Sequence, residues 1–155
     1  MKHYKDEENN IFAYESDGSQ DEFIKEDLVP ISDEDLAILR APTAGQLLSQ
    51  LTAARKEQER QGVVINGIRY AGDPGNRQAM KEAISFMDYA GLTEFESWKD
   101  SDNVFHANHP LVDVVDAYQA IGARRAQLIA TEGEYAAQIT GGTFTDLSSV
   151  TWPRH

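Results

Sequence analysis

Negative charge is concentrated at the start of this chain. The first 35 residues hold three lysines against twelve aspartates and glutamates, a net charge of −9, while the whole chain of 155 residues carries −12. A block of like charge as dense as this is typical of a separate unit rather than of one face of a shared core. The sequence therefore predicts an acidic front segment, residues 1–42, that is distinct from the rest of the chain.

Composition excludes several classes of protein. The chain has no cysteine, so we expect no disulfide framework and no zinc site with cysteine ligands. Its net charge repels the phosphates of nucleic acids and anionic membrane surfaces, so we expect neither as a partner. Since there is no apolar run of membrane-spanning length and no leader-like start, the sequence predicts a soluble protein made in a cytoplasm.

The front segment combines a hairpin pattern with a helix-start signal. Residues 3–5 and 11–14 are short β-prone runs on either side of a polar stretch rich in turn formers, which predicts a hairpin. Ser32 is followed by three acidic residues and then by Leu36, Ile38 and Leu39, before Pro42. This pattern predicts a short helix capped by Ser32.

A second helix is expected from Pro42 onward, as a connector over residues 43–61. Leu47, Leu48, Leu51, Ala54 and Gln58 form a narrow stripe, with Arg55, Lys56, Glu57, Glu59 and Arg60 expected to face outward. An isolated helix of this length is marginal in water, so the segment needs a partner. We interpret it as a connector or a short coiled-coil arm.

The remainder, residues 62–155, is expected to fold as a compact domain. Asn66-Gly67 lies between two β-prone runs and favours a type I′ hairpin turn, because both residues accept positive φ. An amphipathic helix follows, marked by apolar residues between Ala79 and Ala90 and ending near Gly91. A second hairpin is expected over residues 95–107, turning at residues 100–103. The fold class predicted for the chain is α+β, with an acidic hairpin and short helix, a helical connector and a domain of two hairpins and two helices.

A long helix is predicted from Leu111 to about Gly141. Its apolar residues recur every three or four positions, with Arg125 and Glu132 as polar interruptions of the stripe: Leu111, Val114, Tyr118, Ile121, Leu128, Tyr135 and Ile139. The tail after Gly142 contains Phe144, Leu147, Val150 and Trp152, which predicts a packed extended or short helical segment. Trp152 either fixes this tail to the domain or contacts another chain.

The sequence offers little enzyme chemistry, and we expect neither cofactor nor catalytic residue. His106 and His109 have the spacing of a metal-ligand pair, but Pro110 suggests that they flank a strand-to-helix junction, one as a cap and the other on the surface. Asp100, Asp102 and Asn103 fit a tight turn better than a calcium loop, which needs a glycine and a distal glutamate. Arg124-Arg125 is either a partner contact or an ordinary helix-surface pair.

Two parts of the chain resemble phage proteins. The order of residues 64–70, Asp73, 76–78, 98–104, Arg124-Arg125 and 147–152 resembles an uncharacterised domain common at the C-terminal end of phage and prophage tail proteins. The front segment is similar to the start of phage tail-fibre assembly proteins, through Tyr4, Asp6, Asn9-Asn10, Phe12, Tyr14, 30–32 and 36–39. The resemblance implies a tail-fibre assembly chaperone or a small tail structural protein, without catalytic residues.

Two functions are therefore expected, and a third is disfavoured. The chain is either a chaperone or cap that binds a tail fibre, or a structural part of the tail, baseplate or fibre that forms a symmetric homo-oligomer. It would act in the bacterial host cytoplasm during assembly or in the virion tail. A metal-dependent hydrolase is disfavoured, because two unanchored histidines match ligand geometry poorly. Expected partner contacts are Tyr4, Phe12, Tyr14, Leu47, Leu51, Ile121, Arg125, Leu128 and Trp152.

Overall fold

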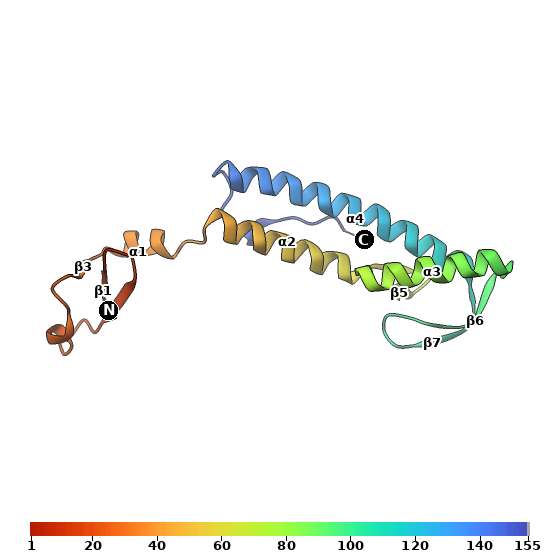
Figure 1. Ribbon diagram of the computed structural model, residues 1–155, viewed down its shortest axis with the longest axis horizontal. Helices are drawn as coiled ribbons and strands as arrows, with labels where there is room; N and C mark the ends of the chain where they lie inside the picture. Colours follow the sequence, from red (N-terminus) through yellow and green to blue (C-terminus); the bar gives the residue numbers. More distant parts are fainter. Residues whose placement is uncertain (155) are drawn as a thin grey trace. The chain divides into compact units, whose positions relative to one another are not determined.

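The computed structural model describes residues 1–154 and divides the chain into two compact units, Met1–Thr43 and Ala44–His155 (Figure 1). The last residue of the expected domain 62–155 lies outside the described part. The predicted α+β class is confirmed, since helices occur together with small antiparallel sheets.

The first unit is built on a small antiparallel sheet with the strand order β2-β1-β3. The expected hairpin is present as β1 (Lys2–Lys5) and β2 (Ile11–Tyr14), and its turn is held by the carboxylate of Asp6, which accepts hydrogen bonds from the amides of Glu8 and Asn10. The sequence did not predict β3 (Val29–Pro30), which pairs with the other edge of β1. Two residues are too few to show a periodic pattern.

The helix of the first unit begins where its cap predicts. The hydroxyl of Ser32 accepts a hydrogen bond from the amide of Asp35, and α1 (Asp33–Arg40) follows directly. A 3₁₀ turn, η1 (Asp21–Phe23), lies between the hairpin and β3. Leu28 and Leu36 are the buried apolar residues of this unit, so its core is small.

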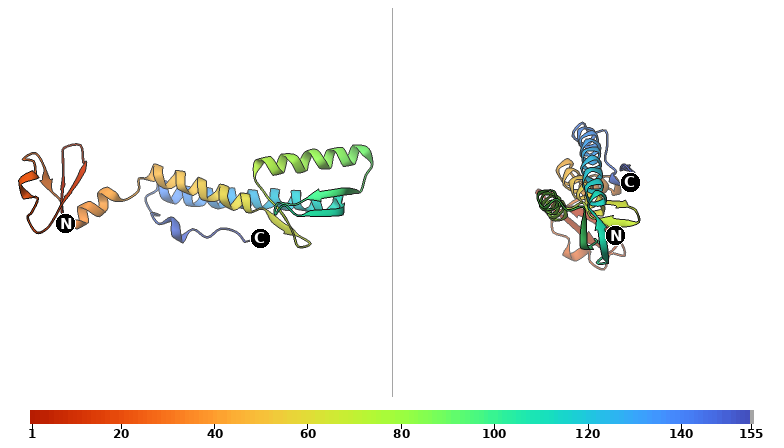
Figure 2. Two further views of the ribbon diagram at one scale, coloured as in Figure 1. Left: turned by 90° about the horizontal axis from the view of Figure 1, so that it is seen from below. Right: turned by 90° about the vertical axis from the view of Figure 1, so that its right-hand side faces the viewer.

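In the second unit, the 30-residue helix α4 (Leu111–Thr140) lies at the centre (Figures 1 and 2). Helix α2 (Ala44–Gln61) runs antiparallel to its second half, because Leu47 and Leu51 near the start of α2 pack with Ile139, whereas Gln58 near its end contacts Arg124. Helix α3 (Pro74–Ala90) lies along the first half of α4, where Met80 packs with Val114 and Ile121. The two shorter helices therefore meet near the middle of α4.

Two hairpins complete the second unit. Strands β4 (Val63–Ile65) and β5 (Ile68–Tyr70) are joined by Asn66 and Gly67 at φ of 51° and 80°, which confirms the type I′ turn. Strands β6 (Glu94–Lys99) and β7 (Phe105–Pro110) form the second expected hairpin. Asp100 accepts hydrogen bonds from the amides of Asp102 and Val104, so these residues build a turn, as expected.

The tail after α4 packs back onto the unit. A 3₁₀ turn, η2 (Leu147–Ser149), interrupts an otherwise extended segment. Phe144, Leu147, Val150 and Trp152 are half-buried against the cluster formed by Leu47, Leu51 and Ile139. The prediction of a packed tail is confirmed, and of the two roles weighed for Trp152, packing onto its own chain is the one observed.

The expected connector over residues 43–61 is part of the second unit from Ala44 onward. Leu51 in α2 is only 1% exposed, because α2 packs along α4 instead of standing alone. The boundary therefore falls between Thr43 and Ala44, not at residue 62. Among the described residues, no helix combines the length and apolar character needed to cross a bilayer.

Candidate functional site

The aromatic residues expected to contact a partner in the first unit lie on one face of its hairpin. Tyr4 is paired with Phe12 across the strands, and Tyr14 meets Tyr4 edge-on with ring centroids 5.6 Å apart. All three side chains are half-buried, so each keeps part of its surface in contact with solvent. This face remains available to a partner.

The apolar contacts expected in the second unit are inside it. Leu47, Leu51, Ile121 and Leu128 are at most 4% exposed, because α2 and α3 cover the stripe of α4. These four residues are core residues of the second unit, so in this structure they offer almost no exposed surface to a partner. Trp152 is half-buried in the tail.

Arg124 and Arg125 are adjacent in sequence but have different environments. Arg125 is exposed and lies 3.2 Å from a carboxylate oxygen of Glu59. Arg124 is 6% exposed and donates to neutral groups, namely the carbonyl of Pro153 and the backbone and side-chain oxygens of Gln58. Burial lowers the pKa of Arg124, since no carboxylate offsets the loss of hydration.

Glu59 is the centre of an ion-pair network where α2, α3 and α4 meet. Its carboxylate is buried and contacts Arg55 from its own helix, Arg77 from α3 at 3.4 Å and Arg125 from α4 at 3.2 Å. Arg55 also pairs with Glu132 of α4. Two carboxylates, those of Glu59 and Glu132, face three arginines in this network, so it keeps an excess of one positive charge.

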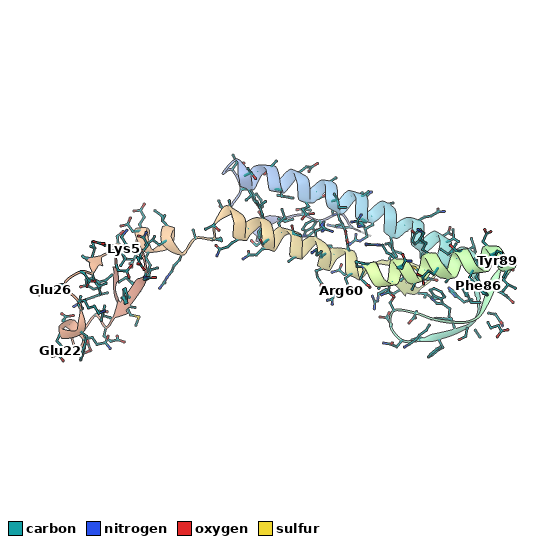
Figure 3. The ribbon with its side chains drawn as sticks, viewed as in Figure 1. Lys5, Glu22, Glu26, Arg60, Phe86 and Tyr89 are labelled. Carbon is teal, nitrogen blue, oxygen red and sulfur yellow. The ribbon has the colours of Figure 1, made fainter. Side chains whose placement is uncertain are left out.

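A groove opens over this network. It consists of two adjoining hollows of about 480 and 390 Å³, which share Pro74, Arg77 and Arg125 in their linings. We call it the arginine groove, and its cationic lining residues are Arg55, Lys56, Arg60, Arg77, Lys81 and Arg125. The acidic residues in the same linings are Glu59 and Asp73. Arg60 projects from the end of α2 (Figure 3).

The first turn of α3 also borders the groove. Asp73 caps this helix by accepting hydrogen bonds from the amides of Gly75 and Asn76. Burial acts to raise the pKa of Asp73, but these hydrogen bonds and one from the Asn76 side chain outweigh it and lower the pKa. Asp73 is thus a charged cap that serves its own helix.

The histidines of β7 belong to an aromatic cluster and not to the expected cap-and-surface pair. His109 is 3% exposed, its Nε2 lies 2.7 Å from the hydroxyl of Tyr70, and its ring stacks on Trp98. His106 is bonded to Asp100 at 2.8 Å. In the described part of the chain, no three histidine or acidic residues are grouped as metal ligands.

Sequence reasoning missed the arginine groove because it placed Arg55 and Glu59 on the outer face of α2. The signal was present, since Leu47, Leu51, Arg55 and Glu59 follow one another at four-residue spacing and so lie in one row along the helix. Arg77 carries no comparable signal, because its neighbour Glu59 lies in a different helix. Only the packing of α3 against the end of α2 brings the two together.

The comparisons identify a family but give no activity. No curated protein and no solved structure matches the chain. A family model described as "Domain of unknown function (DUF4376)" matches residues 42–150, which takes in nearly all of the second unit. By this match over more than half of its length, the chain belongs to the family of the domain of unknown function DUF4376.

Proposed function

We propose that this chain is a non-enzymatic assembly protein of a bacteriophage tail, which binds a tail-fibre protein as a chaperone or cap. The observation that carries the proposal is the separate packing of the acidic first unit, residues 1–43. Its order of hairpin and capped helix is the part of the chain that resembles tail-fibre assembly proteins. A separate unit of this kind is suited to recognising a partner while the second unit keeps its own core.

The surface of the first unit supports steered, reversible binding. Glu22 and Glu26 are exposed and lie on the segment between its hairpin and its helix (Figure 3). Dense surface charge raises the rate of encounter with an oppositely charged partner and discriminates against wrong ones. The half-buried aromatic face of the hairpin supplies apolar contact area beside this charge.

The second candidate function is a structural part of the tail that forms a symmetric homo-oligomer. The stripe of α4 is covered within the chain, so such an assembly would need another apolar surface. Exposed apolar residues at the far end of α3 from Arg60 offer one, namely Phe86 and Tyr89 (Figure 3). Leu92, just after the helix, is exposed as well. Tyr89 is 92% exposed, which favours a contact with another copy of the chain at the C-terminal end of α3.

Co-expression with candidate fibre proteins tests the proposal. We expect one fibre protein to become soluble only when the full chain is present, and to co-purify with it. Quantifying the chain in purified virions then separates the two candidates. A transient chaperone is absent from the particle, whereas a structural part is present at a fixed symmetric copy number.

A further inference from the structure

The arginine groove gathers most of the positive charge of the second unit. Residues 44–155 contain ten lysines and arginines against fourteen acidic residues, so the unit as a whole is negative. Six of those ten cations line the groove, together with only two acidic residues. A positive groove on a negative unit is a local feature that the average charge does not explain.

Arg124 is a buried cation that neighbours two residues of the groove, Glu59 and Arg125. It lines a small enclosed space together with Glu59 and Arg125, and its buried Nε has no hydrogen-bond partner among the described residues. A buried charge with only neutral partners is unfavourable. An anion bound beside the neighbouring Arg125 would lessen that cost, although Arg124 does not itself line the groove.

The chemistry of the lining favours carboxylates on an extended ligand. The planar guanidinium group binds a carboxylate through two parallel hydrogen bonds, and four of the six cations are arginines. Two adjoining hollows suit several residues of a peptide better than one small ion. A short acidic segment can lie within the groove, whereas a long polyphosphate would extend onto the negative surface outside it.

We propose that the arginine groove binds an acidic peptide segment of a partner protein. This inference adds a second contact to the proposed function. It rests on that function only in taking the peptide segment to come from a tail protein. It assigns the second unit a recognition role of its own. The partner is therefore expected to have an acidic segment that binds this groove, separate from the surface that binds the first unit.

The test measures binding of a fluorescein-labelled octaglutamate peptide to the full chain by fluorescence anisotropy at low ionic strength. The variant Arg60→Glu/Lys81→Glu reverses two exposed cations, one from each hollow. It removes the surface pair between Arg60 and Glu57 and leaves the Glu59 network intact. We expect its Kd to rise about tenfold, the equivalent of about 1.4 kcal/mol. Circular dichroism confirms that the variant is folded.

The matched control is Lys25→Glu/Lys99→Glu, which changes the net charge equally at exposed sites outside the groove. We expect its Kd to stay within about twofold of the parent value. The proposal is overturned if the parent does not bind the peptide, if both variants weaken binding equally, or if a single-stranded oligonucleotide binds more tightly. No fibre protein is in this assay, so such a failure leaves the co-expression test of the proposed function unaffected.

Discussion

At the scale of single residues, two glycines allow the chain to pass closely between α2 and α3. Gly62 has φ of 72°, and a Cβ there would lie 1.7 Å from the carbonyl oxygen of Tyr70. A Cβ at Gly72 would lie 2.3 Å from the carbonyl oxygen of Glu59. The backbone that carries Glu59 therefore depends on the absence of a side chain at Gly72.

Replacing Gly72 with alanine should destabilise the second unit. The added methyl group meets backbone and not a flexible side chain, so a shift costing about 1–3 kcal/mol is expected. Thermal and chemical denaturation measure it, with Gly133→Ala as the control, because nothing lies within 4 Å of a Cβ at that helical position. The control should be neutral or slightly stabilising. Equal melting of both variants would contradict the close approach at Gly72.

His109 should make stability depend on pH. Burial lowers its pKa from 6.5, while Asp113 acts to raise it and His106 to lower it further. The unfolded chain then binds a proton more readily than the folded one, so stability is full above about pH 6.5 and falls as the pH drops toward the lowered pKa. The slope from this one group is at most about 1.4 kcal/mol per pH unit.

Urea unfolding between pH 7 and pH 5 checks this prediction. The variant His109→Gln cannot gain the proton, so its free energy of unfolding should decline less over this range than that of the parent. Because both chains keep the same carboxylates, the difference between the two slopes isolates the histidine. Parallel slopes would show that His109 is protonated equally in the folded and unfolded states.

At the scale of elements, the sequence predicted each helix and hairpin whose signal is local. Asn66-Gly67 set its own turn, and Ser32 marked the start of its own helix. Pairings that depend on distant residues were not predicted. Nothing near α2 in the sequence reveals that its partner is the second half of α4, nor that Arg124 is buried while Arg125 is exposed.

The packing of α2 changes what can fold alone. A fragment beginning at Ala44 should fold, since it retains the whole second unit. A fragment beginning at Gly62 lacks Leu47 and Leu51, which leaves Ile139 and the half-buried tail without their cover. We expect this fragment to lose cooperative unfolding, because each buried leucine contributes about 2–5 kcal/mol to the free energy of unfolding.

Circular dichroism melts of the two fragments, compared with the full chain, check this expectation. The fragment from Ala44 should show a cooperative transition like that of the second unit in the full chain. A cooperative transition in the fragment from Gly62 would instead show that residues 62–155 fold without α2, as expected if residues 43–61 are a connector. The comparison tests the domain boundary without reference to function.

At the scale of the whole molecule, two regions differ in charge from the rest of the chain. The first unit concentrates acidic residues, and the arginine groove concentrates cations on a second unit that is negative overall. The charge of the front segment could be read from the sequence by counting. The groove could not, because its cations come from three helices that only packing brings together.

The most direct test of the proposed function is a pull-down of the solubilised fibre protein by the full chain and by a variant lacking residues 1–43, across a salt series. We expect the full chain to bind and salt to weaken the binding, since exposed charges are screened beyond about 8 Å at physiological ionic strength. The shortened variant should remain folded and bind more weakly, through the salt-sensitive contact of the arginine groove alone. Retained, salt-insensitive binding by the shortened variant would contradict a recognition role for the acidic first unit.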